Sequence, residues 1–110
     1  LEHYDMVKKM IPQAEVYVSI DNQSQAIQGF IGLDGDYIMG IFVDGQKQSH
    51  GVGSQLLKFV KDKKKNLTLN VYQKNTRAIQ FYLKNDFKIV KETFDEDTME
   101  KEYLMIYENK

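Results

Sequence analysis

The sequence predicts an α/β fold, α+β in type, in which helices cover a mixed β-sheet. The first half of the chain carries alternating apolar and polar segments separated by turn residues, which is typical of hairpin-linked strands. The second half alternates strand-like and helix-like segments, which favours helices packed on the same sheet. The 110 residues, 42% of them hydrophobic, are enough for one core. We therefore expect a single domain over residues 1–110.

In the first half we expect one helix followed by three strands. Apolar residues recur at helical spacing from Leu1 to Ile11, and Pro12 ends that pattern. Beyond it, apolar residues recur at every second position, which is the period of a strand. The dipeptide Asp34-Gly35 is typical of a tight hairpin turn. The strands are predicted over residues 14–20, 25–33 and 37–43.

In the second half we expect two helices and three strands. An apolar stripe backed by lysines predicts a helix over residues 51–65. Asn75 can cap a second helix, which runs to Lys84. Short segments with alternating apolar residues predict the remaining strands. These strands are predicted over residues 67–71, 87–94 and 103–107.

Composition argues against several classes of function. The net charge is -1, from 15 basic and 16 acidic residues, so no overall positive field is available to hold nucleic acid. The chain has no cysteine, which removes thiolate chemistry and fits the cytoplasm. No apolar run approaches the roughly 20 residues that span a bilayer, so we expect no membrane partner. His3 and His50 lie outside any cluster with ligand spacing, and we expect no metal.

The most informative segment is the glycine-containing loop that opens the helix predicted at Gly51. Backbone N–H groups at such a helix start converge on one spot, which suits a phosphate or pyrophosphate. A Walker A loop is excluded because no Lys follows Gly51. A Rossmann loop is excluded because Leu56 stands where the third glycine is required.

Two motifs, in the right order, resemble those of the GCN5-related N-acetyltransferases (GNAT). Gln48, Gly51 and Gly53 match the family signature R/Q-x-x-G-x-G/A, which holds the pyrophosphate of acetyl-coenzyme A. Residues 75–87 resemble the family's following helix, with Asn, a small residue, an aromatic residue and Tyr, ending near Gly-Phe. The one departure is Asp86 where Gly is usual, and Asp tolerates a left-handed backbone less well than Gly.

This resemblance covers residues 14–110 and implies a fold and a donor site. The implied fold is the GNAT-like acyl-CoA N-acyltransferase fold, in three layers. Its central, mostly antiparallel sheet is splayed between the strands at 41–43 and 69–71. Acetyl-CoA is the implied co-substrate and enters that gap, and no metal is implied. The implied donor-binding residues are Ile41, Val43, Gln48, Ser49, His50, Gly51, Val52, Gly53, Ser54, Asn75 and Tyr82.

The resemblance also implies acetyl transfer to a primary amine by direct attack in a ternary complex. Tyr82 matches the usual general acid, and a Tyr with a pKa of about 10 can protonate the leaving thiolate. The alternative for Tyr82 is an inward-facing core residue. Asn70 is expected either to orient acceptor or water, or to be a satisfied polar residue of the fold. No residue stands out as the general base. A non-catalytic acyl-CoA-binding module and a truncated inactive fragment are the alternative functions.

Members of the family usually begin with a further strand and helix, so this chain resembles an N-terminally shortened member. Without that strand, the strand at 14–20 is expected to be unpaired on one side. An unpaired edge invites pairing with a second copy, as a homodimer. Lys47 and Lys58 are near enough in sequence to help hold phosphate, although both are equally typical of solvated surface lysines.

Overall fold

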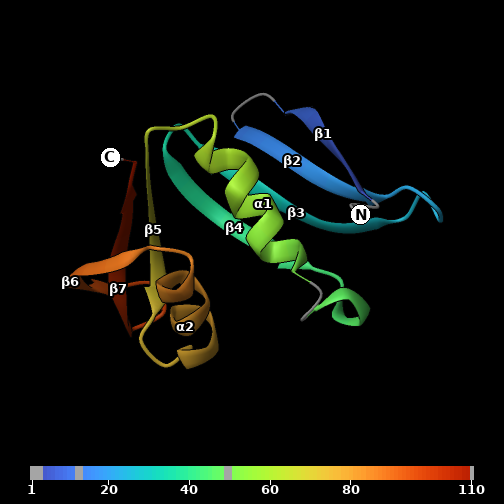
Figure 1. Ribbon diagram of the computed structural model, residues 1–110. Helices are drawn as coiled ribbons and strands as arrows, with labels where there is room; N and C mark the ends of the chain where they lie inside the picture. The colour runs from blue at the N-terminus through green and yellow to red at the C-terminus, as the bar shows by residue number, and fades with distance from the viewer. Residues whose placement is uncertain (1–3, 12–13, 49–50, 110) are drawn as a thin grey trace. The chain divides into compact units, whose positions relative to one another are not determined.

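The computed structural model describes residues 4–11, 14–48 and 51–109 (Figure 1). The chain divides into two compact units, Leu1–Lys63 and Lys64–Lys110. In each unit, strands pair antiparallel and one α-helix accompanies them. The predicted combination of sheet and covering helices is therefore confirmed.

The first unit is built on strands that pair in chain order, so each hairpin brings neighbouring segments together. The hairpin predicted at Asp34-Gly35 is present, and Gly35 adopts the left-handed φ of 58° that favours glycine. A short 3₁₀ helix, η1, precedes the α-helix. The elements are β1 (Tyr4–Ile11), β2 (Ala14–Asp21), β3 (Ile27–Asp34), β4 (Tyr37–Val43), η1 (Gly45–Lys47) and α1 (Val52–Lys61).

The helix predicted over residues 1–11 is wrong, because residues 4–11 form strand β1. Val7 lies opposite Val18, and Ile11 lies opposite Ala14. A helix this short is marginal by itself, whereas a strand at this position gives the backbone groups along β2 hydrogen-bond partners. The expectation that strand 14–20 is unpaired on one side is therefore wrong too. β2 pairs with β1 and with β3, so the edge on which the homodimer was expected is occupied.

Helix α1 packs against one face of β2, β3 and β4 (Figure 1). Its buried side chains occur at helical spacing, as the apolar stripe predicts. They meet buried side chains of the strands, and this contact is the core of the first unit. The fully buried members are Ile31, Leu33, Leu56, Leu57 and Val60. The helix is shorter than predicted and ends at Lys61, before the run of lysines.

The second unit is a sheet with the strand order β5-β7-β6, together with helix α2. Alternation in β5 buries Leu67, Leu69 and Val71, while the residues between them are less buried. β7 begins at Glu100, earlier than predicted, because its first residues pair with the end of β6. The elements are β5 (Asn66–Tyr72), α2 (Thr76–Lys84), β6 (Lys88–Asp95) and β7 (Glu100–Glu108).

Candidate functional site

The segment between β4 and α1 is folded by its own polar groups. The Asp44 carboxylate accepts a hydrogen bond of 3.0 Å from the Gln46 N–H, and the Lys47 N–H donates to the Asp44 carbonyl at 2.7 Å. These bonds form η1, which the sequence analysis did not predict, although Asp before Gly is a turn signal. Gln48 follows in an extended conformation. The predicted site residues Ser49 and His50 lie outside the described residues.

Gly51 provides the backbone conformation that opens α1. Its φ of 81° is left-handed, which a residue with a Cβ adopts only with strain. Gly51, the N-cap residue, has no side chain with which to cap the helix. The helical ladder begins with the Gln55 N–H donating to the Gly51 carbonyl at 3.0 Å, so the three preceding N–H groups have no acceptor within the helix. These N–H groups belong to Val52, Gly53 and Ser54.

Gly29 of β3 lets the start of α1 approach the sheet closely. A Cβ placed on Gly29 would lie 3.0 Å from a methyl carbon of Val52 and 3.3 Å from one of Leu56. It would also lie 2.9 Å from the Phe42 carbonyl oxygen, a distance that real Cβ atoms do not show. The position of the first helical turn is therefore set by the absence of a side chain on β3.

The predicted donor-binding strand carries a β-bulge. Gly32 lies opposite Gly40, whereas Leu33 lies opposite Ile38, so β4 has one more residue than β3 at this point. Such a bulge turns the strand that follows it. Ile41 and Val43 lie in this following part, both half-buried. The Val43 carbonyl also accepts a long hydrogen bond, 3.4 Å, from the Gln48 side-chain amide.

Lys47 has a carboxylate partner in the first unit. Its Nζ lies 3.1 Å from Oδ2 of Asp21, the last residue of β2. The Asp21 side chain is only 17% exposed and that of Lys47 is 37% exposed, so the pair is partly sheltered from water. Lys58, in contrast, lies on the exposed side of α1. The positive charge of Lys47, expected to help hold phosphate, is therefore balanced by Asp21 in this structure.

In the second unit, Asn75 caps α2 as predicted. Its side-chain oxygen accepts a hydrogen bond of 3.1 Å from the Ala78 N–H, and its carbonyl accepts one of 3.1 Å from the Ile79 N–H. This is the arrangement of a helix N-cap. The cap uses the side-chain oxygen, so the Asn75 amide NH₂ takes no part in it.

Tyr82 lies within a chain of aromatic rings. Its ring centroid is 5.3 Å from that of Phe81 and 5.5 Å from that of Phe87, and Phe87 is 5.7 Å from Tyr107. Burial raises the pKa of the Tyr82 hydroxyl, because the charged phenolate is poorly solvated there. Tyr82 therefore keeps its proton at neutral pH and has it available to donate.

The turn after α2 is tight, although Asp86 replaces the usual glycine. Asp86 adopts a left-handed φ of 70°. The next N–H, that of Phe87, then donates to the Tyr82 carbonyl at 3.0 Å. The turn is therefore as tight as one with glycine, at the cost of backbone strain at Asp86.

The two predicted catalytic residues belong to opposite faces of the second unit's sheet. Tyr107, at the end of the aromatic chain that starts at Tyr82, lies opposite Leu67. Asn70 points to the other face, where its amide donates to the Thr93 hydroxyl at 3.3 Å. The structure therefore does not bring Asn70 and Tyr82 together within this unit.

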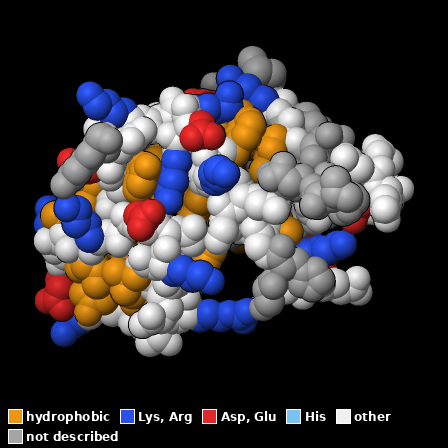
Figure 2. Space-filling view, viewed as in Figure 1, with side chains coloured by type: hydrophobic (Ala, Val, Ile, Leu, Met, Phe, Trp, Pro, Cys, Tyr) orange, Lys and Arg blue, Asp and Glu red, His pale blue; other side chains and the backbone are white. Residues whose placement is uncertain are grey.

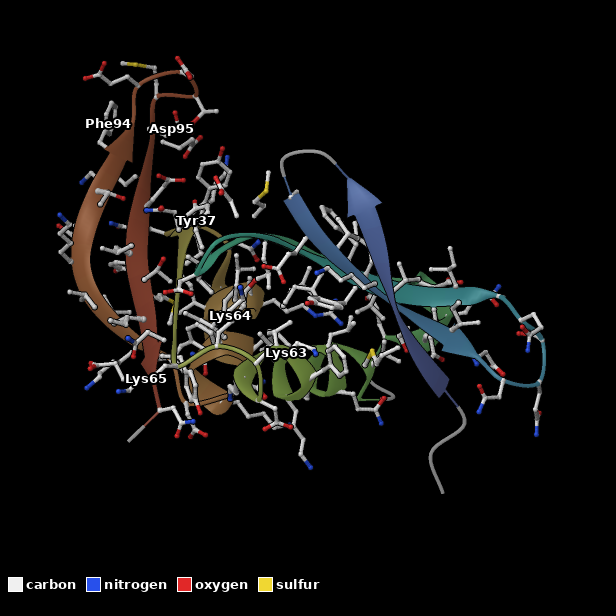
Figure 3. All side chains as sticks on the ribbon, turned by 90° about the horizontal axis from the view of Figure 1, so that it is seen from above. Tyr37, Lys63, Lys64, Lys65, Phe94 and Asp95 are labelled. Carbon is white, nitrogen blue, oxygen red and sulfur yellow. The ribbon has the colours of Figure 1, made fainter. Side chains whose placement is uncertain are left out.

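The face that carries Asn70 mixes polar and apolar side chains, because Asn70 lies opposite Leu104 and Thr68 lies opposite Ile106. The Tyr72 hydroxyl donates a hydrogen bond of 3.4 Å to Asp95, which Figure 3 labels at the end of β6.

On the surface seen in Figure 2, basic side chains are interspersed with acidic and apolar ones, which fits the net charge of -1. Among the described residues, no group of three or more His, Asp and Glu side chains is arranged to hold a metal ion.

Sequence reasoning missed the contacts that hold the β4–α1 segment. Asp21 and Lys47 are 26 residues apart, and Ser19 and Gln28, whose buried side chains share a 2.7 Å hydrogen bond, are nine apart. No local pattern marks such pairs. The polar run from Asp21 to Ser24 indicates a turn, and nothing in it points to Lys47.

Known proteins with the same motifs are acetyltransferases. The acetyltransferase (GNAT) domain family matches residues 12–89. The peptidyl-lysine N-acetyltransferase YjaB of Salmonella typhimurium is 31% identical over 85 residues, which cover 77% of this chain and 58% of that protein. YiaC of Escherichia coli, with the same enzyme name, is 32% identical over 78 residues, 70% of this chain and 53% of that protein. The chain thus spans little more than half the length of these relatives.

Solved structures show the same fold. The solution structure of apo YjaB from Escherichia coli has a TM-score of 0.76 at 27% identity, covering 90% of this chain and 68% of that one. A GNAT family acetyltransferase from Elizabethkingia anophelis, solved with acetyl-CoA bound, has a TM-score of 0.81 at 21% identity, covering 98% and 99% of the two chains. The fold and motifs define an acetyltransferase-type domain. This chain belongs to the GNAT family. None of the helices in the described residues has the length and apolar character needed to cross a membrane.

Proposed function

We propose that this chain is an N-acetyltransferase that moves the acetyl group of acetyl-CoA to a primary amine by direct attack in a ternary complex. The observation that carries the proposal is the start of α1 after the left-handed Gly51, a cap residue that has no side chain. The N–H groups of this helix start suit a pyrophosphate. Family membership and the acetyl-CoA bound to the Elizabethkingia anophelis structure support the identity of that ligand.

The donor residues have distinct tasks in this proposal. The backbone of residues 48–54 receives the pyrophosphate, and Ile41 and Val43 offer backbone groups to the peptide-like pantetheine arm. Asn75 adds a contact through its amide NH₂. Backbone N–H groups donate hydrogen bonds to the thioester carbonyl and polarise it. These hydrogen bonds strengthen as negative charge develops on the carbonyl oxygen.

Tyr82 supplies the proton that the reaction needs. Acetyl-CoA provides an activated acetyl group as a thioester. The amine nitrogen forms a bond to the carbonyl carbon, the carbon–sulfur bond breaks, and the sulfur takes a proton from the Tyr82 hydroxyl. The neutral amine loses one proton to water, and the Tyr82 phenolate takes one proton back from water, so the overall balance needs no other reactant. Asn70 orients the acceptor or a water in this proposal, acting from the face that it shares with Thr93.

The relatives YjaB and YiaC are named peptidyl-lysine N-acetyltransferases, which supports a lysine side chain as the first acceptor to test. The experiment measures release of free coenzyme A from acetyl-CoA with lysine peptides, polyamines and small amines, alongside calorimetric binding of acetyl-CoA. Tyr82→Phe is expected to lower kcat by about 100-fold or more, the lower end of the range for general acid catalysis, with unchanged acetyl-CoA affinity.

Two results would contradict this function. Binding of acetyl-CoA without turnover on any amine would favour a non-catalytic acyl-CoA-binding module or an inactive fragment. Absence of binding at millimolar acetyl-CoA would show that the chain has no donor site for acetyl-CoA. Tyr82→Phe with full kcat would leave the acetyltransferase in place and assign the proton to another group.

A further inference from the structure

The Asp21 carboxylate joins two separate segments of the first unit. Its Oδ1 accepts hydrogen bonds from the N–H groups of Gln23 at 2.9 Å and Ser24 at 3.3 Å, which fold the turn after β2. Its Oδ2 lies 3.1 Å from Nζ of Lys47 in η1. One side chain at the end of β2 therefore contacts both its own turn and the segment that leads to α1.

Lys47 transmits this contact to the backbone of that segment. Its N–H donates to the Asp44 carbonyl at 2.7 Å, and the Asp44 N–H donates to the Gln28 carbonyl at 3.0 Å. Gln28 is itself fixed, because its buried side-chain amide donates to the Ser19 hydroxyl at 2.7 Å. The segment Asp44–Gln48 is thus held at two points, through Gln28 on β3 and through Asp21 on β2.

A lysine paired in this way is poorly suited to attract phosphate directly. A carboxylate 3.1 Å away cancels most of its field at longer range. The pKa of Asp21 is held below its usual range, first by the Gln23 N–H and then by Lys47, so the carboxylate is charged at neutral pH. The pair therefore favours a role in holding the segment over a role in contacting the ligand.

We propose that Asp21 is a positioning residue for donor binding, which acts through Lys47 to hold the segment Asp44–Gln48 in the conformation that presents the start of α1 to the pyrophosphate. This role rests on the proposed function. It is separate from the glycine motif, because neither Asp21 nor Lys47 belongs to the pattern formed by Gln48, Gly51 and Gly53.

Asp21→Asn tests the role with little disturbance, because the amide keeps an oxygen for the turn but loses the charge that pairs with Lys47. Partly exposed ion pairs contribute up to about 1 kcal/mol, so the Kd for acetyl-CoA is expected to rise about 2- to 5-fold. The Kd for S-acetylpantetheine, which lacks the pyrophosphate, is expected to stay unchanged. A defect of general folding would change both.

Lys47→Gln is the second variant and removes the same ion pair from the other side. If Asp21 acts through Lys47, the double variant binds acetyl-CoA no more weakly than Lys47→Gln alone. The matched control is Glu100→Gln, which breaks the 2.8 Å ion pair with Lys74 in the second unit. That control is expected to leave both Kd values unchanged. Hydrogen exchange of the Gln46 and Lys47 N–H groups measures local opening of the segment without any ligand, and it is expected to be faster in Asp21→Asn.

Three results would overturn the proposal. Unchanged acetyl-CoA affinity in Asp21→Asn would show that the ion pair does not position the segment. Tighter binding would show that Asp21 competes with phosphate for Lys47. An equal change for acetyl-CoA and S-acetylpantetheine would reduce Asp21 to a general structural residue. Failure of the proposed function is distinguished from these, because there the unaltered chain itself does not bind acetyl-CoA.

Discussion

The ring of Phe87 packs edge-on against the ring of Tyr82, with centroids 5.5 Å apart and an interplanar angle of 62°. The Phe87 N–H also donates to the Tyr82 carbonyl at 3.0 Å. The residue after the α2 turn therefore fixes both the backbone and the side chain of the proposed general acid. Since Phe87 is 3% exposed, its ring cannot move without opening the core of the second unit.

Phe87→Leu is expected to lower the free energy of unfolding by about 1–2 kcal/mol, because a smaller side chain leaves a cavity and the ring contact is lost. If Phe87 orients Tyr82, kcat falls as well, while acetyl-CoA affinity stays. Denaturant unfolding and steady-state kinetics measure the two effects. Phe94→Leu is the matched control, since Phe94 is 50% exposed and the same change there is expected to cost less than about 0.5 kcal/mol.

Gly51→Ala is expected to destabilise the fold by about 1–2 kcal/mol, since a Cβ is disfavoured at φ 81°. Gly35→Ala is a close control, because Gly35 also has a positive φ and no atom within 4 Å of an added Cβ. Both variants are expected to lose similar stability in thermal unfolding. Only Gly51→Ala is expected to weaken acetyl-CoA binding, and an equal loss of binding in both would contradict the assignment of the donor site to the start of α1.

Asp86→Gly is expected to raise the free energy of unfolding by about 0.5–1 kcal/mol. Glycine adopts φ 70° without the strain of a Cβ, although it loses more backbone entropy on folding. Asp86→Ala separates this effect from the removal of the charge, because Ala keeps the Cβ. A gain of stability in Asp86→Ala equal to that in Asp86→Gly would show that charge, and not backbone strain, limits the turn.

The buried Tyr17 is expected to lower the free energy of unfolding at alkaline pH. Burial, and then the hydrogen bond of its hydroxyl to Glu15, raise the pKa of Tyr17 from 10.0 to about 12. Between these values the unfolded chain loses the Tyr17 proton while the folded chain keeps it, so stability falls as pH rises through this window. Urea unfolding from pH 9 to 12 measures the slope. Tyr17→Phe is expected to flatten it, and an unchanged slope would show that other groups govern alkaline unfolding.

The sequence was informative wherever a local rule decides the structure. The Asn75 cap, the Asp34-Gly35 hairpin and the start of α1 next to Gly51 follow from the backbone chemistry of single residues, and all are present. The segment at 1–11 could not be predicted in this way. Its apolar spacing fits a helix, and only pairing with the edge of β2, the next strand along the chain, makes it a strand.

The candidate site likewise combines features that a local motif indicates with features that arise only when separate segments pack together. The motifs point to Gly51 and Tyr82 as site residues, and these assignments stay predictions; the structure gives Gly51 a left-handed φ and raises the pKa of Tyr82 by burial. The pairing of Asp21 with Lys47 was not found, because ordinary charged residues acquire that role only when folding brings them together. The position of Asn70 on the face opposite the aromatic chain likewise depends on sheet register, which alternation alone does not link to α2.

The missing side chain at Gly29 has a consequence for how this domain can diverge. Because β3 and the first turn of α1 are in contact at that point, a Cβ at position 29 would force the Phe42 backbone or the first turn of α1 to shift. A single methyl group there would displace the helix start even if every residue of the glycine motif were retained. A homologue with an intact motif but a larger residue at this strand position is therefore expected to have lost donor binding, or to have shortened Val52 or Leu56 in compensation.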